Sequence, residues 1–206
     1  MARNDKTPEP ALVCDFTSGA VRHRLLYGGG RGQALPRAIG MKGGKTPTVA
    51  DATAGLGGDA FLLASLGATV TLIEAAPRIH QLLAEAMDRG REAGGAVAEA
   101  IARMTLLHGD SREILPTLDP APEVVLVDPM HPERKKSALV KQEMRLIREI
   151  VGDNPDAADL MRVALATATK RVVLKWPRLA DPLPGLPAPS HQIVGKSTRF
   201  DVFMRG

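Results

Sequence analysis

The chain has 206 residues, of which 44% are apolar and 24% are charged, and this composition is that of a folded protein with one substantial core. The first residues are charged with no apolar block behind them, and no later apolar run approaches the length that spans a bilayer. A single cysteine, Cys14, excludes an intramolecular disulfide and a multi-cysteine metal site. We expect a cytoplasmic protein that binds neither a membrane nor a metal ion.

Strand-like and helix-like patterns alternate along the chain. The predicted strands cover 46–52, 68–74, 104–110, 123–129 and 171–176, with a final pair at 191–197 and 198–205. The predicted helices cover 58–67, 77–94, 135–152 and 156–169. This alternation predicts an α/β fold, a mostly parallel, doubly wound sheet with helices on both faces and a C-terminal antiparallel strand.

Basic residues are concentrated in two parts of the chain. Residues 1–45 hold eight lysines or arginines against three acidic residues, a net charge of +5, whereas the whole chain has +4. Residues 134–148 hold six basic residues against Glu143. Such patches suit a phosphate backbone, although a charged run is often only a solvated face. We expect 1–45 to be a short basic segment that faces the substrate and 46–206 to be the main domain.

The turn after the first predicted strand has the sequence DATAGLGGDA. Gly55, Gly57 and Ala60 satisfy the pattern G-x-G-x-x-A, and Glu74 ends the next strand 19 residues after Gly55. In a doubly wound sheet this turn binds the ligand, and the acidic side chain accepts hydrogen bonds from a ribose diol. The pattern predicts an adenosine-type cofactor, which is either a nicotinamide dinucleotide or S-adenosylmethionine (SAM).

Three polar residues at strand ends bear on this choice. Asp51 lies four residues before Gly55, where its carboxylate can bind the amino group of a methionine tail. Asp110 and Ser111 end the third strand and are placed to meet an adenine edge. An alternative for Asp51 and Asp110 is that each caps the turn that follows it, as aspartate often does.

The fourth predicted strand ends in LVDPMHP, at residues 126–132. A base amine is a poor nucleophile because its lone pair is conjugated into the ring. Asp128 and the carbonyl of Pro129 can accept the two amine protons as hydrogen bonds, which directs the lone pair toward an electrophilic methyl group. His131 stands where an aromatic residue would stack on the base. The alternative is a turn with an incidental Asp-Pro pair.

From about Phe16 to its end, the chain resembles the bacterial small-subunit ribosomal RNA (guanine-N2)-methyltransferases of the J type. The matching stretches are HRLLYGGGRGQALPRAIGMKG, VADATAGLGGDAFLLASLG, LVDPMHPERKKSALVKQEMR, ATKRVVLKWP and TRFDVF. The resemblance implies a Rossmann-like class I methyltransferase fold, SAM as cofactor and a guanine of 16S rRNA as substrate. Carried over by position, the cofactor contacts fall at Gly58, Asp59, Glu74, Ala75, Asp110, Ser111 and Asp128. The chain departs from the family at His131, commonly phenylalanine, and at Gly58 and Ala75, often arginines.

The glycine run at 27–33 carries Arg31 and follows Arg22 and Arg24, so that it can wrap a phosphate with backbone amides and guanidinium groups. It can equally be a flexible linker. Lys135 and Lys136, directly after the DPMHP motif, are further candidates for RNA contacts. Trp176 is a candidate for gripping one base, as are Tyr27 and His131.

The leading hypothesis is methyl transfer from SAM to a guanine amino group of 16S rRNA or of the small ribosomal subunit. Two alternatives stay open at this point. One is a nicotinamide-dependent oxidoreductase, and the other is a catalytically silent RNA-binding module that serves ribosome assembly.

Overall fold

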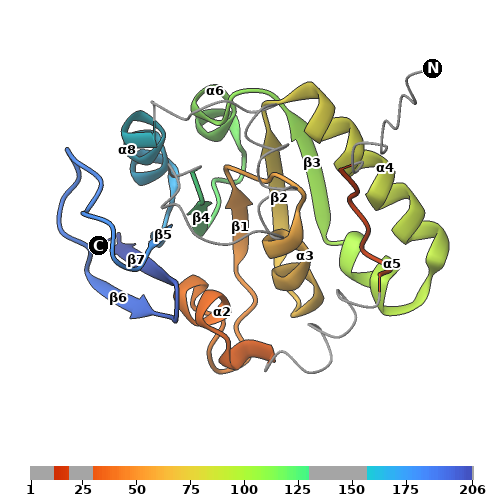
Figure 1. Cartoon of the computed structure of the whole chain (residues 1–206), viewed down its shortest axis with the longest axis horizontal. Helices are drawn as coiled ribbons and strands as arrows, with labels where there is room; N and C mark the ends of the chain where they lie inside the picture. The colour runs from red at the N-terminus through yellow and green to blue at the C-terminus, as the bar shows by residue number, and fades with distance from the viewer. Residues whose placement is uncertain (1–11, 19–29, 130–156, 206) are drawn as a thin grey trace, which may run out of the picture.

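The computed structural model describes residues 12–18, 30–129 and 157–205 (Figure 1). Several predictions fall outside these ranges, namely the helix at 135–152 and the roles of Arg22, Arg24, Tyr27, His131, Lys135 and Lys136. Within the described ranges, no helix is long and apolar enough to cross a membrane.

The described strands form one seven-stranded sheet in the order β3-β2-β1-β4-β5-β7-β6. The strands are β1 (Thr48–Asp51), β2 (Thr69–Glu74), β3 (Met104–His108), β4 (Val124–Val127), β5 (Arg171–Pro177), β6 (His191–Val194) and β7 (Thr198–Met204). The pairs from β3 to β5 are parallel, and β7 is antiparallel to both β5 and β6. The mostly parallel sheet with a C-terminal antiparallel strand is therefore confirmed.

Helices cover both faces of this sheet (Figure 1). They are α2 (Ala34–Ile39), α3 (Gly58–Ser65), α4 (Pro77–Ala93), α5 (Gly95–Ile101), α6 (Ser111–Ile114) and α8 (Ala157–Thr167), with 3-10 turns η1 (Gly30–Gly32) and η2 (Leu115–Thr117). Three short helices, α2, α5 and α6, were not among the predicted elements. Each spans seven residues or fewer, too few for a helical period to stand out in the sequence.

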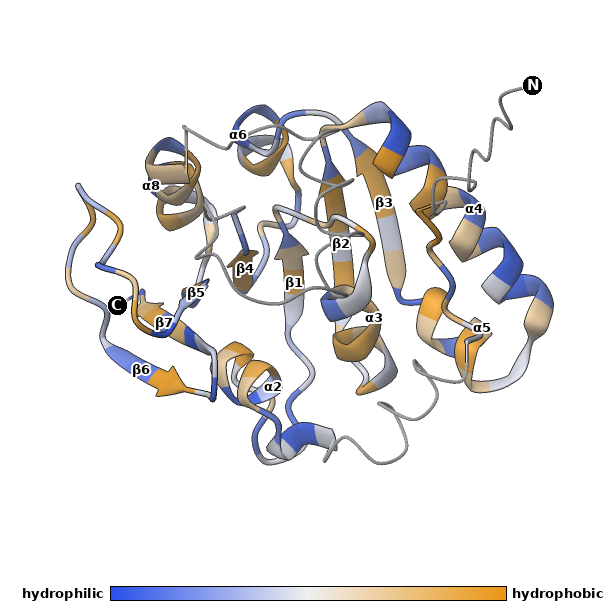
Figure 2. Cartoon of the chain, in the orientation of Figure 1, coloured by the Kyte–Doolittle hydropathy of each residue, from blue (hydrophilic) through white to orange (hydrophobic). Residues whose placement is uncertain are grey.

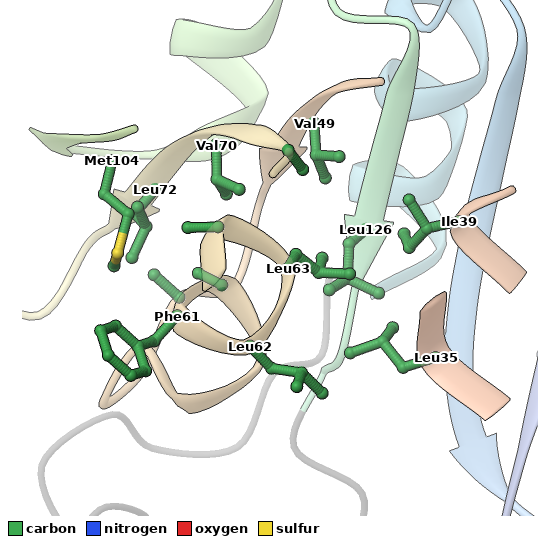
Figure 3. Close-up of a cluster of buried hydrophobic side chains, with 14 of the residues drawn as sticks. Leu35, Ile39, Val49, Phe61, Leu62, Leu63, Val70, Leu72, Met104 and Leu126 are labelled. Carbon is green, nitrogen blue, oxygen red and sulfur yellow. The ribbon is translucent and has the colours of Figure 1, made fainter. Parts of the chain in front are cut away.

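Two apolar cores lie on opposite faces of the sheet because successive strand residues point to opposite sides. Val124 and Leu126 of β4 pack with α2, α3, α4 and α5 in the first core, part of which Figure 3 shows. Val125 and Val127 pack with α6 and α8 in the second. Figure 2 shows the resulting pattern, with apolar strands between helices, such as α4, that carry polar outer faces. The continuous apolar run of β4 is thus buried on both faces, as predicted.

The described part of residues 1–45 shares the first core. Phe16 is buried and its ring stacks on that of Phe61 in α3, with ring centroids 4.6 Å apart. Cys14 is buried nearby, donates its thiol to the carbonyl of Leu56, and has a pKa raised to about 12 by burial. Helix α2 adds Leu35 and Ile39 to the same core (Figure 3). The predicted substrate-facing role of residues 1–45 stays a prediction.

Candidate active site

The polar residues predicted at strand ends lie along the carboxyl edge of the parallel strands. Asp51 ends β1, Glu74 ends β2, and Asp128 follows β4, which is the neighbour of β1. The chain order reverses between β1 and β4, since β2 and β3 lie on one side and β5 on the other. This is the switch point at which doubly wound sheets bind their ligands.

The loop between β1 and α3 connects these strand ends through three hydrogen bonds. The amide of Gly55 donates to Oε2 of Glu74 at 2.8 Å. The Oγ1 hydroxyl of Thr53 accepts from the amide of Asp128 at 2.7 Å. The hydroxyl of Ser111 donates to the carbonyl of Ala52 at 2.7 Å. The glycine loop therefore fixes the position of the β2, β3 and β4 ends relative to one another.

Glu74 is buried and holds two backbone amides. Its Oε1 accepts from Ala76 at 2.8 Å, while Oε2 accepts from Gly55 at the same distance. Burial raises the pKa of Glu74, although these amides and the charge of neighbouring His108 oppose the rise. Each carboxylate oxygen has a second lone pair, so a ribose diol can bind without displacing either amide. His108, paired with Glu74 across β2 and β3, was not predicted to belong to the site.

A lysine that the sequence analysis did not single out joins two of the predicted carboxylates. Nζ of Lys175 lies 2.7 Å from Oδ2 of Asp59 and 2.7 Å from Oδ2 of Asp128. Burial disfavours the lysine's charge, but the two carboxylates outweigh it and raise the pKa of Lys175. Burial also raises the pKa of Asp128, against the opposing effect of Lys175. Lys175 is thus a cation held between two carboxylates at the carboxyl edge.

Asp51 is near this group of charged residues and is 3% exposed. Its Oδ1 accepts from the amide of Thr53 at 3.2 Å, so it caps the turn that follows, as the alternative reading proposed. Burial raises the pKa of Asp51 to about 7, and the charges of Asp59 and Asp128 add to the rise. With this pKa the carboxyl of Asp51 is only partly ionised at pH 7, and a cation placed beside it would favour the ionised form.

The three glycines of the loop serve different purposes. Gly57 has a φ of +70°, and a Cβ there would lie 2.7 Å from Cδ1 of Leu83, so packing against α4 requires glycine. Gly55 has a φ of +53° and little around it. A Cβ at Gly58, the first residue of α3, would meet no atom within 4 Å. The close backbone approach predicted for a ligand is therefore possible at Gly58, whereas Gly57 is used for the core.

Of the two residues predicted to meet an adenine edge, Asp110 makes local contacts, whereas the hydroxyl of Ser111 donates to the carbonyl of Ala52 in the glycine loop. Oδ1 of Asp110 accepts from the amide of Arg112 at 2.8 Å and caps α6, and the carboxylate also pairs with the Arg112 guanidinium. These bonds with Arg112 hold the pKa of Asp110 below its usual range. The capping alternative describes the structure at Asp110, and an adenine contact stays a prediction.

The structure does not bring Arg31 together with Asp128. The Arg31 guanidinium donates to the carbonyls of Lys45, just before β1, and Leu66, at the end of α3. Both carbonyls lie near the amino ends of the parallel strands. Asp128 lies at their carboxyl ends, which form the opposite edge of the sheet. Trp176 is 7% exposed and its indole donates to the carbonyl of Asp181, so its ring is part of the core rather than presented to a base.

The donor set fits SAM better than it fits a metal. In the described part of the chain, no group of three or more His, Cys, Asp or Glu side chains is arranged to hold a metal ion. Glu74 can hold a ribose diol, and the space beside Gly58 is open to a ligand. Asp59 and Asp128 supply two carboxylates against the single ammonium of Lys175, and this excess of negative charge, to which Asp51 adds when it is ionised, favours a cationic ligand.

The chain is similar to known methyltransferases. A family model described as "Putative SAM-dependent methyltransferase" matches residues 1–205. Ribosomal RNA small subunit methyltransferase J of Agrobacterium fabrum is 63% identical over 199 residues, which cover 97% of this chain and 95% of that protein. The protein of the same name from Shewanella amazonensis is 48% identical, over 100% of this chain and 82% of its own length. The crystal structure of a SAM-dependent methyltransferase from Neisseria gonorrhoeae has a TM-score of 0.75 and 39% identity, covering 97% of this chain and 76% of that one.

Proposed function

The chain belongs to the family of SAM-dependent methyltransferases that includes the J-type enzymes of the small ribosomal subunit, and from this premise we propose that it methylates the exocyclic N2 amine of a guanine in 16S rRNA. Membership of this family decides the cofactor in favour of SAM over a nicotinamide dinucleotide. The proposal that the methyl acceptor is an amine rests on Asp128 and the Pro129 that follows it. The hydrogen bond from the Asp128 amide to Thr53 holds this pair beside the glycine loop.

The residues of the carboxyl edge would divide the binding of SAM among them. Glu74 would hold the ribose hydroxyls, and Asp51 would pair with the ammonium of the methionine tail. Gly58 would let the cofactor approach the first turn of α3. Ala75, Asp110 and Ser111 would line the adenosine end.

Bound SAM would supply an electrophilic methyl group, and the bond from this group to sulfur would break as the bond to N2 forms. Asp128 accepts one N2 hydrogen, and the Pro129 carbonyl accepts the other, so that the nitrogen lone pair is aimed at the methyl carbon. The proton released from N2 passes to Asp128 or to water. Holding the two reactants in line supplies much of the remaining rate enhancement. His131 would stack on the guanine.

The basic residues would bind the RNA backbone around this site. Arg22 and Arg24 in the N-terminal segment, and Lys135 and Lys136 after the DPMHP motif, are the residues we assign to phosphates, whereas Arg31, at the amino ends of the strands, is not assigned to this site. A guanine inside folded RNA must leave its stack to reach Asp128, at a cost of a few kcal/mol that phosphate contacts can offset. We place the activity in the cytoplasm, where small ribosomal subunits are assembled.

Methyl incorporation tests the proposed function. Purified protein, tritiated SAM and small ribosomal subunits from cells lacking the gene should give about one labelled methyl group per 16S rRNA. Subunits from wild-type cells, already methylated, are the control and should take up little label. If the protein binds both RNA and SAM yet transfers no label to naked 16S rRNA or to subunits, the silent RNA-binding module becomes the better account.

Cofactor binding should depend on pH through Asp51. With a pKa of about 7, Asp51 carries a proton below pH 7 and must release it to pair with the ammonium of SAM. The association constant should therefore rise by up to about tenfold per pH unit from pH 5.5 to 7, with proton release visible by calorimetry in buffers of different ionisation enthalpy. Asp51→Asn should weaken binding and flatten this dependence, and NAD should bind far more weakly than SAM. Tight NAD binding, or a pH-independent affinity for SAM, would count against these assignments.

The basic patches should control the salt dependence of RNA binding. Reversing Arg22 and Arg24 to glutamate, or Lys135 and Lys136, should raise the KM for RNA and leave the affinity for SAM unchanged. Each lost phosphate contact should reduce the slope of log K against log salt by about 0.7 to 0.9. Reversal of Arg91 and Arg103, exposed and remote from Asp128, is the matched control. Unchanged slopes in both test variants would show that the patches are solvated faces.

A further inference from the structure

Lys175 connects three elements at one point of the candidate site. Its strand, β5, pairs with β4 in a register that sets Leu174 beside Val127, so Lys175 and Asp128 occupy the next positions along two neighbouring parallel strands. The other partner, Asp59, lies in the first turn of α3. Both contacts measure 2.7 Å, and the lysine side chain is 27% exposed. The ammonium is thus shared between an assigned catalytic carboxylate and a carboxylate of the helix that begins at the glycine loop.

We propose that Lys175 is a positioning residue for methyl transfer, which keeps Asp128 in its ionised form and binds its Oδ2, so that Oδ1 is the oxygen that accepts the N2 hydrogen of the substrate. The inference rests on the proposed function, since it assigns how Asp128 is prepared for that reaction. It does not require that Lys175 itself touch RNA or SAM.

The charges around Asp128 show why a cation is needed there. Asp59 of α3 and Asp51 of β1 face the same region, and the neighbouring charge of Asp59 raises the pKa of Asp128 further above what burial alone produces. Lys175 of β5 is the cation that opposes these effects, by its charge and by its hydrogen bond. A protonated carboxyl would present a donor where the amine needs an acceptor. Without the ammonium, the pKa of Asp128 would be higher, so that its carboxylate would become protonated earlier as the pH falls.

Lys175 and Asp59 influence the ionisation of Asp128 in opposite directions. Removing the lysine charge should move the ionisation of Asp128 to higher pH, because burial and the repulsion from Asp59 are then unopposed. Removing the charge of Asp59 should move it to lower pH, because a source of repulsion is lost and Lys175 is left to Asp128 alone. A merely structural role for the lysine would produce neither shift, since lost packing lowers activity equally at every pH.

The test is the pH profile of single-turnover methyl transfer from SAM to small ribosomal subunits, at saturating concentrations, from pH 5.5 to 9. Lys175→Met should reduce the rate at least tenfold at pH 7 and shift the acid limb upward by about one to three pH units, so that much of the rate returns at pH 9. Lys175→Arg should retain a profile close to that of the wild type. Lys170→Met is the matched control, because Lys170 lies directly before the first residue of β5, toward the end opposite to Lys175, and pairs with Glu123. Its profile should be unchanged.

Asp59→Asn gives a second, independent readout should Lys175→Met fail to fold. It should move the acid limb downward by about one pH unit, whatever its effect on the KM for SAM. An unshifted limb in Asp59→Asn, or a rate in Lys175→Met that is unchanged or is lowered equally at every pH, would overturn the role of Lys175. Absence of transfer by the wild-type protein would instead overturn the proposed function, and the two failures are therefore distinguishable.

Discussion

Replacing Asp128 by alanine should lower the rate of methyl transfer by a factor of about 10² to 10⁴, the usual contribution of a positioned acid or base group. The guanine amine then loses its acceptor, and Lys175 loses one of its two carboxylate partners. The affinity for RNA should stay nearly constant, because one carboxylate at the base contributes little beside many phosphate contacts. Rapid-quench transfer assays and filter binding measure the two quantities separately.

The Asp128→Asn variant should be almost as inactive as Asp128→Ala. An ammonium can only donate, so Lys175 would draw the amide oxygen of Asn toward itself and leave the NH₂ group directed at the substrate amine. Asp88→Ala, which removes an exposed carboxylate of α4, is the control and should transfer methyl groups at the wild-type rate. An Asp128→Ala variant with a wild-type rate would show that the amine is activated by another group.

Replacing Glu74 by alanine should weaken SAM binding by about 1 to 3 kcal/mol, or roughly 5- to 150-fold in the dissociation constant. The change removes the acceptor for the ribose diol and leaves the amides of Gly55 and Ala76 without their partners. Glu74→Gln should also weaken binding, since its NH₂ group must face one of these amide donors. Calorimetry gives the affinity, and a thermal melt shows how much of the loss reflects the loop.

The control for Glu74 is Glu85→Ala, because Glu85 is exposed on α4, where its carboxylate accepts from the side-chain amide of Gln81. Its affinity for SAM should equal that of the wild type. If Glu74→Ala binds SAM normally in a folded protein, the ribose is held elsewhere and the assignment of the cofactor site along β2 is wrong.

Sequence patterns sufficed for the sheet because each strand is a short apolar run bounded by turn residues. The run at 123–129 became β4, buried on both faces, and the helix predicted at 77–94 became α4 almost to the residue. The sequence at 34–39 was not read as a helix, since it is six residues long and contains Pro36. Helix α5 was missed because it begins at Gly95, directly after the Gly94 that ends α4.

Residues of the candidate site could be predicted only where their positions follow from the order of the strands along the chain. Asp51, Glu74 and Asp128 were found because each comes at a strand end, and parallel strands end on one edge of the sheet. Lys175 was missed because its importance depends on the register between β4 and β5, which no local pattern contains. A lysine within the apolar run RVVLKW was the available signal, since a buried charge requires partners.

The use of Asp110 could not be foreseen from its position alone. Both a cap and an adenine contact suit an aspartate at the end of a strand, and the arginine two residues later decided which bonds form in the protein itself. Trp176 was misjudged for a related reason, because burial of a strand's last residues depends on the loop that folds over them.

Methylation of a guanine N2 of 16S rRNA by this protein can be tested by mass mapping of rRNA from cells that lack the gene. A single N2-methylguanosine should disappear from 16S rRNA, return on expression of the wild-type protein, and not return on expression of Asp128→Ala at the same level. An unchanged set of methylated nucleotides in 16S rRNA after loss of the gene would contradict it, as would full restoration by the Asp128→Ala variant.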